Sequence, residues 1–294
     1  MQLNSQKCTK LLFHSGLGNQ LFQWSYLQIM LSKGFCISPA YTPSLISSDR
    51  PLQVSKLISD QGLSLERINK IEYESLVKLM EYFGRIQFLQ ERFLDYRDKP
   101  FAIPLEKELR NAFILTGYFQ SFSFVQENSK VVIPFLTSYL NKISVPNPLN
   151  RDTNVIHIRG GDLKNRENFN KYGVLGVNFY ESLPIDYSLD TIIVTDDLER
   201  AQFIAKKIKV NSIIGPETLN PWQALKLMVD STNLFAANST LSLWASFLKL
   251  NKKGLAYVPN PIFRDRNFDA NGSLSLPGVH QLLSQFQNFD DSQS

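Results

Sequence analysis

Cysteine and histidine are scarce in this chain of 294 residues, which contains two cysteines and three histidines. Two cysteines, Cys8 and Cys36, are too few for a disulfide framework, and a reducing compartment is the simplest interpretation. The few histidines and cysteines also leave no candidate zinc cluster. Paired carboxylates on facing elements, which a glycoside hydrolase needs, are not evident either.

Long apolar runs and strong net charge are missing as well. No run approaches the roughly 20 apolar residues of a membrane-spanning helix, and the start, MQLNSQKCTKLLF, lacks the basic flank and long apolar stretch of a signal peptide. We therefore expect a cytoplasmic protein that is soluble or only peripherally associated with a membrane. The net charge of +4 comes from basic residues scattered among acidic ones, which disfavours nucleic acid as a partner. A mild positive excess does suit a substrate that carries a diphosphate.

The chain has an ordinary globular composition, 43% hydrophobic and 20% charged, which is enough for one large or two medium cores. Near the start, an apolar stretch, LLFH, leads into a glycine loop, SGLG. The segment that follows has apolar residues at helical spacing from Leu21 up to Gly34. This pattern predicts a strand, a loop and a helix, the opening of an α/β unit. Another buried strand is predicted at 113–115, within NAFILTGYFQS.

Proline, asparagine and charged residues concentrate at 142–154, which predicts a connector and gives domains at 1–150 and 151–294. Beyond it, short apolar runs alternate with helical patterns, which predicts βαβ units around a parallel sheet. We expect strands at 155–158, 191–194, 212–214, 233–236 and 255–258, and helices at 198–208, 222–229 and 241–250. Ligands of such sheets bind at the carboxyl ends of the strands, where the strand order reverses.

Two glycine-containing segments follow predicted strands. In HIRGGD, Arg159 lies beside flexible backbone, an arrangement that suits a bound phosphate; the alternative is an ordinary surface turn. In HSGLGNQ, glycines permit close approach to the backbone, and the following helix offers free amide donors and a positive dipole end. The alternative for this segment is a helix start capped by a serine or asparagine.

Two further polar segments, VTDD and ANST, also follow strands. Asp196 and Asp197 could accept hydrogen bonds from the ring amide and exocyclic amine of guanine; a helix N-cap is the alternative, and a metal site lacks a third ligand nearby. Asn238, Ser239 and Thr240 come directly before an apolar helix. The hydroxyls of Ser239 and Thr240, together with the first amides of that helix, form a candidate anion site. Ordinary capping by one of the two hydroxyls is the alternative.

The ordered set GLGNQLFQ, GYFQS, HIRGGD, TDD and ANSTLSLWASF resembles the bacterial α-1,2-fucosyltransferases of glycosyltransferase family 11, over nearly the whole chain. The resemblance implies an α/β fold of the GT-B type, two Rossmann-like domains facing across a cleft, with the donor nucleotide bound by the carboxyl-terminal domain. It implies inverting transfer of L-fucose from GDP-β-L-fucose to a galactose hydroxyl of a glycan. The acceptor would be a glycan, lipid-linked glycans included, that is used in surface polysaccharide or oligosaccharide synthesis. This synthesis would take place at the inner face of the membrane. No metal or cofactor would be required. Similar arginine motifs occur in α-1,6- and protein O-fucosyltransferases, so this element indicates GDP-fucose more strongly than a linkage.

Carried over residue by residue, the resemblance gives a predicted catalytic set of Arg159, His157 and Asp162. Arg159 matches the arginine that contacts the diphosphate. His157 and Asp162 are candidate bases for the acceptor hydroxyl, or hold Arg159 in place. The predicted substrate-binding residues are Gly16, Gly18, Asn19, Gln20, Asp196, Asp197, Asn238, Ser239 and Thr240.

The chain departs from the family pattern at three places. Gly160 stands where the family motif HxRRGD has a second arginine, VTDD stands for FSDD, and NSTLSLW stands for NSTFSWW. Lys164 and Arg166 are candidates for restoring the missing charge. The departure at Gly160 leaves two alternatives open: a transferase of the same fold with another linkage or GDP-sugar, and a sugar-nucleotide-binding protein of weak activity. Acceptor recognition is expected in the amino-terminal half, around 41–97.

Overall fold

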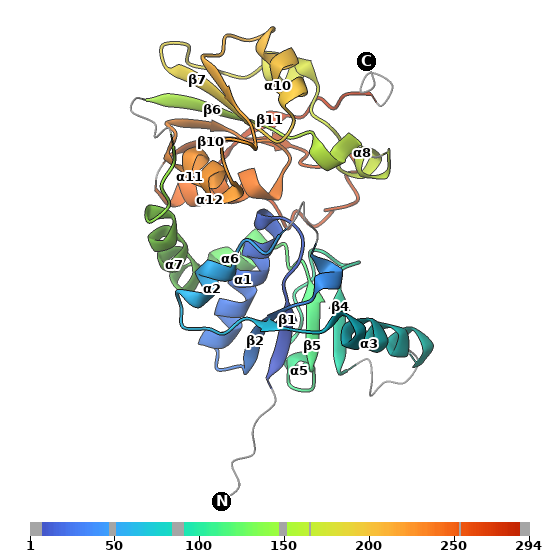
Figure 1. Cartoon of the computed structure of the whole chain (residues 1–294). Helices are drawn as coiled ribbons and strands as arrows, with labels where there is room; N and C mark the ends of the chain where they lie inside the picture. The colour runs from blue at the N-terminus through green and yellow to red at the C-terminus, as the bar shows by residue number, and fades with distance from the viewer. Residues whose placement is uncertain are drawn as a thin grey trace, which may run out of the picture. The chain divides into compact units, whose positions relative to one another are not determined.

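The computed structural model describes residues 8–46, 51–83, 91–146, 152–164, 166–252 and 254–288. The chain divides into two compact units, Met1–Leu136 and Thr137–Ser294, referred to below as unit 1 and unit 2. Each unit is built on its own parallel sheet with helices packed against it (Figure 1). The division falls within the helix Ser129–Asn141. The predicted boundary after residue 150 lies outside the described residues and stays a prediction.

Unit 1 has a five-stranded parallel sheet of order β3-β2-β1-β5-β4. The strands are β1 (Thr9–Leu12), β2 (Ile37–Tyr41), β3 (Glu66–Arg67), β4 (Phe93–Tyr96) and β5 (Ile114–Gly117). Its helices are α1 (Leu17–Ser32), α2 (Ser55–Ser59), α3 (Lys70–Phe83), α5 (Glu106–Leu109), α6 (Phe122–Glu127) and the first part of α7 (Ser129–Asn141), with a 3-10 turn at Pro43–Leu45. From Leu17 to Met30 every residue of α1 except Asn19 is buried, as expected of a helix that is apolar on most of its surface.

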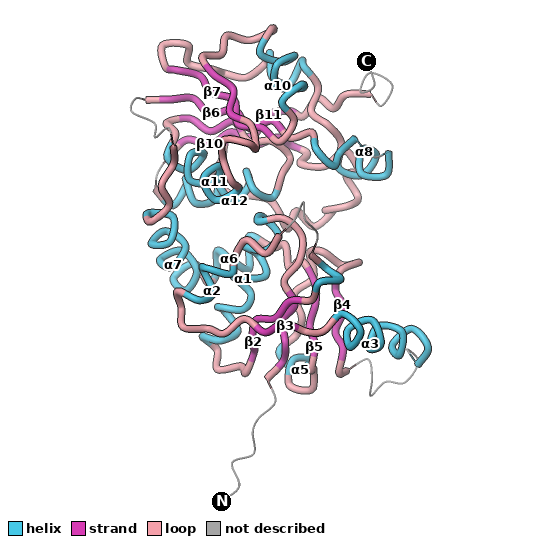
Figure 2. Tube along the Cα trace, viewed as in Figure 1, coloured by secondary structure: helices cyan, strands magenta, loops and turns pink. Residues whose placement is uncertain are grey.

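Unit 2 has a six-stranded sheet of order β11-β10-β9-β6-β7-β8, parallel throughout. Figure 2 shows strands of this sheet in magenta, with helices in cyan beside them. The strands are β6 (Thr153–Ile158), β7 (Asp190–Thr195), β8 (Ser212–Ile214), β9 (Asn233–Phe235), β10 (Leu255–Asn260) and β11 (His280–Leu283). Numbered by their succession within the unit, they read 3-2-1-4-5-6 across the sheet, the strand order of dinucleotide-binding folds. The helices are α8 (Arg166–Tyr172), α9 (Val177–Glu181), α10 (Leu198–Ala205), α11 (Pro221–Asp230) and α12 (Thr240–Asn251).

The core of unit 2 forms around β6, whose six residues are all buried. Ile156 and Ile158 pack in one cluster with Phe179, Ile193 and Phe235. Because side chains alternate along a strand, His157 projects from the opposite face of the sheet. Figure 1 shows α10 and the neighbouring pair α11 and α12 on opposite sides of this sheet.

The predicted fold class, α/β with two Rossmann-like units of the GT-B type, is confirmed by these two sheets. The five strands predicted after residue 154 are all present, each within two residues of its predicted ends. The expected cleft between the domains stays a prediction. The strands β2, β3, β4 and β11 were not predicted from the sequence.

Candidate functional site

In unit 2, the strand order reverses between β6 and β9, and the loops that follow these two strands meet there. Arg159, directly after β6, donates from Nη1 to the hydroxyl of Ser239, after β9, at 3.4 Å, although the residues are 80 positions apart. Ser239 is buried and caps α12 by accepting the Leu241 amide at 3.3 Å. A guanidinium, a hydroxyl and the first amides of α12 thus lie together, which is the chemistry of an anion site at a switch point.

The two carboxylates after β7 contact the same turn. Oδ1 of Asp196 accepts the Gly160 amide at 2.8 Å, and Asp196 is exposed to solvent. Asp197 is buried and caps α10 by accepting the Arg200 amide at 3.2 Å, so the capping alternative describes this residue. A Cβ atom on Gly160 would lie 2.2 Å from Oδ2 of Asp197, a distance at which only glycine fits. The HIRGGD and VTDD segments therefore form an interlocked turn, in which Asp196 accepts the backbone amide of Gly160 and the carboxylate of Asp197 packs against Gly160.

His157 lies on β6 two residues before Arg159 and is 5% exposed. Its Nδ1 has no hydrogen-bond partner within the described part of the chain. Burial lowers the pKa of His157 to about 4, with Arg159 acting in the same direction and Asp196 opposing it. His157 is consequently neutral at pH 7. The side chain of the third predicted catalytic residue, Asp162, lies outside what the structure describes.

The remaining predicted residues of unit 2 are Asn238 and Thr240. Both amide hydrogens of Asn238 are used, because Nδ2 donates to the carbonyls of Tyr172 at 3.0 Å and Gly173 at 2.9 Å. Thr240 is the first residue of α12 and is half-buried. Asn238 thus fastens the segment after α8 to the loop after β9, and its role toward a substrate stays a prediction.

The HSGLGNQ segment of unit 1 also lies at a switch point, where the order reverses between β1 and β5. Gly16 is the N-cap of α1, whose start has no side-chain cap, and a Cβ on Gly16 would meet no atom within 4 Å. Gly18 is buried in the first turn. Asn19 accepts a hydrogen bond from Gln120, after β5, at 2.7 Å.

Gln20 has a structural role that the sequence did not indicate. Its Nε2 donates to the carbonyls of Ser15 and Pro51, and its Oε1 accepts the amides of Gln53 and Val54, at 2.6 to 3.2 Å. These four bonds use the hydrogen-bonding capacity of the side chain and tie the segment before α2 to the glycine loop. The predicted residues thus gather within each unit at the carboxyl ends of its strands.

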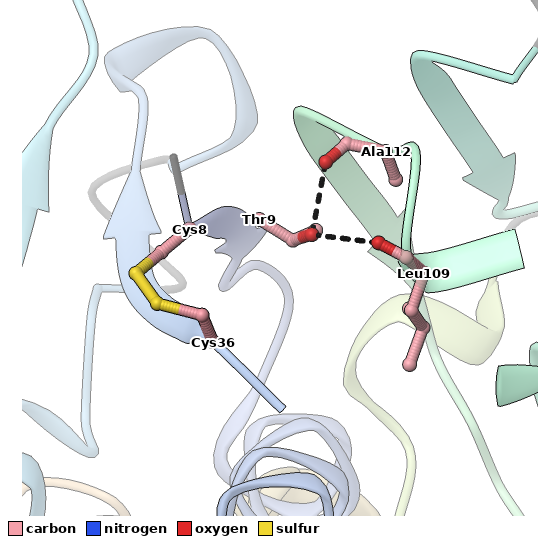
Figure 3. Close-up of a disulfide and its surroundings, with 5 residues drawn as sticks. All are labelled: Cys8, Thr9, Cys36, Leu109 and Ala112. Atoms are coloured by element: carbon pink, nitrogen blue, oxygen red, sulfur yellow. Dashed lines mark hydrogen bonds between the residues drawn. A yellow bond between two sulfur atoms is a disulfide. The ribbon is translucent and has the colours of Figure 1, made fainter. Parts of the chain in front are cut away.

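The inference of a reducing compartment from the two cysteines loses its basis, because Cys8 and Cys36 form a disulfide (Figure 3). The register of β1 against β2 pairs Thr9 with Ile37, so the residues just before them are neighbours, with Cα atoms 4.6 Å apart. Thr9 also donates to the carbonyls of Leu109 and Ala112, as Figure 3 shows. A bond between the cysteines removes the reason to infer a reducing compartment.

Among the described residues, no group of three or more histidine, cysteine, aspartate or glutamate side chains is placed to hold a metal ion. None of their helices combines the length and apolar character needed to cross a membrane.

No family model and no curated protein matches the chain. Among solved structures, it is similar to a glycosyl transferase family 9 protein from Veillonella parvula, with 10% identity, a TM-score of 0.45, and 100% of this chain and 89% of that one covered. The heptosyltransferase WaaC of E. coli, solved with ADP, gives 9% identity, a TM-score of 0.45, and 97% coverage of both chains. POFUT1 in complex with GDP gives 11% identity, a TM-score of 0.38, and 82% and 94% coverage. Because these TM-scores are below 0.5, the similarity does not support assigning the activities of these proteins to this chain. The activity has to be inferred from the residues at the two switch points.

Proposed function

We propose that this chain is an inverting glycosyltransferase that moves L-fucose from GDP-β-L-fucose to a galactose hydroxyl of a glycan in α-1,2 linkage. The observation that carries the proposal is the contact of Arg159 with Ser239 at the switch point of a 3-2-1-4-5-6 sheet. This arrangement supports a bound nucleotide diphosphate. The resemblance to family 11 supports fucose as the sugar, the galactoside acceptor, and a reaction without a metal.

In this reaction the acceptor oxygen bonds to C1 of fucose while the bond from C1 to the phosphate oxygen breaks. The electron pair leaves with GDP, and the acceptor proton passes to a base. Negative charge therefore grows on the diphosphate, where the guanidinium of Arg159 and the hydroxyl of Ser239 are placed to stabilise it. Removing one such donor typically slows turnover by a factor of about 10² to 10³.

Asp196 is the better placed of the two acidic residues to meet guanine, since Asp197 is buried in its cap. The base is proposed among His157 and Asp162. Replacing the true base, by His157→Gln or Asp162→Asn, should lower kcat while leaving the affinity for GDP unchanged. Replacing a residue that only positions Arg159 should weaken GDP binding as well.

The decisive experiment combines calorimetric titration of GDP with an assay of fucose transfer to a panel of galactosides. We expect Arg159→Ala to weaken GDP binding at least tenfold and to lose most turnover, and Arg159→Lys to rescue poorly because lysine lacks the planar guanidinium. The control is Arg266→Ala, which removes an exposed arginine of the same unit. Normal transfer by a folded Arg159→Ala protein, or no GDP binding by the unaltered chain, would overturn the proposal.

One observation favours a second candidate, a sugar-nucleotide-binding protein of weak activity. The carboxylate of Asp197 fills the space beside Gly160, the position at which the family pattern has its second arginine. GDP binding without transfer to any galactoside would favour this candidate. Comparing the hydrolysis of GDP-fucose with that of GDP-mannose would distinguish these two candidates from a transferase that uses another GDP-sugar.

A further inference from the structure

A cluster of polar and aromatic side chains lies at the carboxyl ends of β1, β5 and β4 in unit 1. His14 follows β1, Tyr118 follows β5, and Asp95 and Arg97 lie at the end of β4. The three strands are neighbours in the sheet, so these side chains come from adjacent positions along its edge. His14 and Tyr118 belong to the HSGLGNQ and GYFQS segments that the sequence analysis singled out, and Asp95 and Arg97 lie in the range 41–97 where acceptor recognition is expected.

His14 contains a polar atom that the protein itself does not satisfy. The residue is 4% exposed, and its ring meets Tyr118 edge-on with ring centres 4.8 Å apart. Nδ1 lies 3.2 Å from the Ser15 hydroxyl, while Nε2 has no hydrogen-bond partner among the described residues. Burial, assisted by Arg97 and opposed by the Gly117 backbone and Asp95, lowers the pKa of His14 to about 4, so the ring is neutral. In the tautomer that donates from Nδ1 to Ser15, Nε2 is a hydrogen-bond acceptor. Buried polar atoms without partners are rare, and such an atom beside a loop indicates a missing ligand group.

The loop that contains His14 and the loop that follows β5 hold unusual backbone conformations. Ser15 has φ +67° and Phe119 has φ +53°, and both lie in the left-handed region that non-glycine residues rarely adopt. Gly117 is required at the end of β5, because a Cβ there would lie 2.7 Å from the ring of Phe119. Strain of this kind persists where the surrounding structure fixes it and concentrates at ligand sites.

Asp95 and Arg97 form the exposed edge of the cluster. Nε of Arg97 donates to both carboxylate oxygens of Asp95, at 2.9 and 3.0 Å, and each side chain is about one-third exposed, 33% for Asp95 and 34% for Arg97. The pair has no net charge, and His14 adds none. Tyr73 of α3 interacts electrostatically with both members of the pair, and its buried hydroxyl has no partner among the described residues either.

We propose that this cluster is a binding site for a neutral pyranoside, the acceptor sugar of the proposed transfer reaction. The four polar groups that carry it are the Nε2 acceptor of His14, the carboxylate of Asp95, the guanidinium of Arg97 and the hydroxyl of Tyr73. Sugar hydroxyls donate to the first two and accept from the guanidinium, while the half-buried ring of Tyr118 offers an apolar face. A phosphate fits poorly, because the internal pair leaves no net positive charge. The assignment of the ligand as acceptor rests on the proposed function, whereas the site itself does not.

The test is saturation-transfer NMR on the full chain with methyl β-D-galactopyranoside, together with kinetics of transfer. We expect His14→Phe and Arg97→Gln each to raise the KM for the galactoside at least tenfold and to abolish the NMR signal. Tyr118→Leu provides a variant at a half-buried position in case His14→Phe fails to fold. The calorimetric Kd for GDP should stay within twofold. The matched control is Glu106→Gln, at the opposite end of this sheet, where Glu106 pairs with Lys33 at 3.0 Å.

The outcomes separate the two proposals. GDP binding without galactoside binding, or galactoside KM values unchanged in all folded variants, overturns the pyranoside site and leaves the donor site standing. Displacement of the galactoside by inorganic phosphate at low millimolar concentration also overturns it, because the site would then be an anion site. Galactoside binding that is lost in the variants, in a chain that does not bind GDP, supports the site and overturns the proposed function.

Discussion

Replacing Gly160 by alanine is the sharpest test of the geometry at the switch point of unit 2. The added Cβ would lie 2.2 Å from Oδ2 of Asp197 and 2.6 and 2.7 Å from its Cβ and Cγ. Three close contacts to one short side chain cannot be relieved by turning its far end. Asp197 would have to leave its position, and it would thereby release the Arg200 amide that it caps at the start of α10.

The cost follows from these two effects. Inserting a methyl group into a fully packed position typically costs about 1–3 kcal/mol, and losing an aspartate N-cap costs about 1 kcal/mol. We therefore expect Gly160→Ala to lower the free energy of unfolding of unit 2 by about 2–4 kcal/mol. For a unit of this size the melting temperature should fall by roughly 5–10 °C.

Thermal and urea unfolding, followed by circular dichroism, measure this change. The matched control is Gly161→Ala, whose Cβ would lie 3.0 Å from Oδ2 of the exposed Asp196, so that this carboxylate has to shift by only a few tenths of an ångström. We expect less than about 0.5 kcal/mol there. Adding Asp197→Ser to Gly160→Ala should recover much of the loss, because serine still caps a helix but is smaller. A Gly160→Ala protein as stable as the unaltered chain would refute the reasoning.

Three further predictions concern stability. Cys36→Ser, which opens the loop of 28 residues closed with Cys8, should lower the free energy of unfolding of unit 1 by about 3–4 kcal/mol in urea titrations; equal stability with and without dithiothreitol would count against it. Lys249 is buried and donates to the Ser231 carbonyl, and burial lowers its pKa to about 8. Since the unfolded chain holds this proton up to about pH 10.4, stability should rise from pH 8 to pH 10 relative to Lys249→Met, and parallel pH profiles of the two proteins would contradict this. The pKa of His14 is about 4 in the folded protein, below the unfolded value of about 6.5. The contribution of His14 to the free energy of unfolding is therefore fully present above pH 6.5. It decreases by up to about 3 kcal/mol as the pH falls to 4. His14→Phe should flatten that part of the urea-derived profile.

Strands with an apolar run could be predicted from the sequence, including the edge strand β8, whereas edge strands without such a run could not. VIHI is buried, TIIV is buried except for the half-buried Ile192, and the two segments match β6 and β7 closely. In contrast, β3 contains two exposed residues, and three of the four residues of β11 are exposed. These edge strands are defined by pairing with a neighbour, which leaves little hydrophobic pattern in the chain itself.

The candidate site divides in the same way. That Arg159 and Ser239 come close could be anticipated, because the carboxyl ends of neighbouring parallel strands lie at one edge of a sheet. The contact of Gly160 with Asp197 could not, because it depends on the register of β6 against β7 and on the rotamer of a capping residue. The disulfide belongs to this second group, since it follows from the register that places Cys8 beside Cys36.

The same contact determines how the missing second arginine can be tested. An arginine at position 160 would meet Asp197 with its Cβ before its guanidinium could reach a phosphate. Gly160→Arg alone should therefore destabilise unit 2, because the cap of α10 is displaced, and it should bring no increase in turnover. Gly160→Arg combined with Asp197→Ser relieves the overlap and keeps a capping oxygen, so only this pair measures what a second guanidinium adds to GDP affinity. If Gly160→Arg alone raised turnover at unchanged stability, the glycine and the aspartate would be independent, and the interlocked turn described above would be wrong.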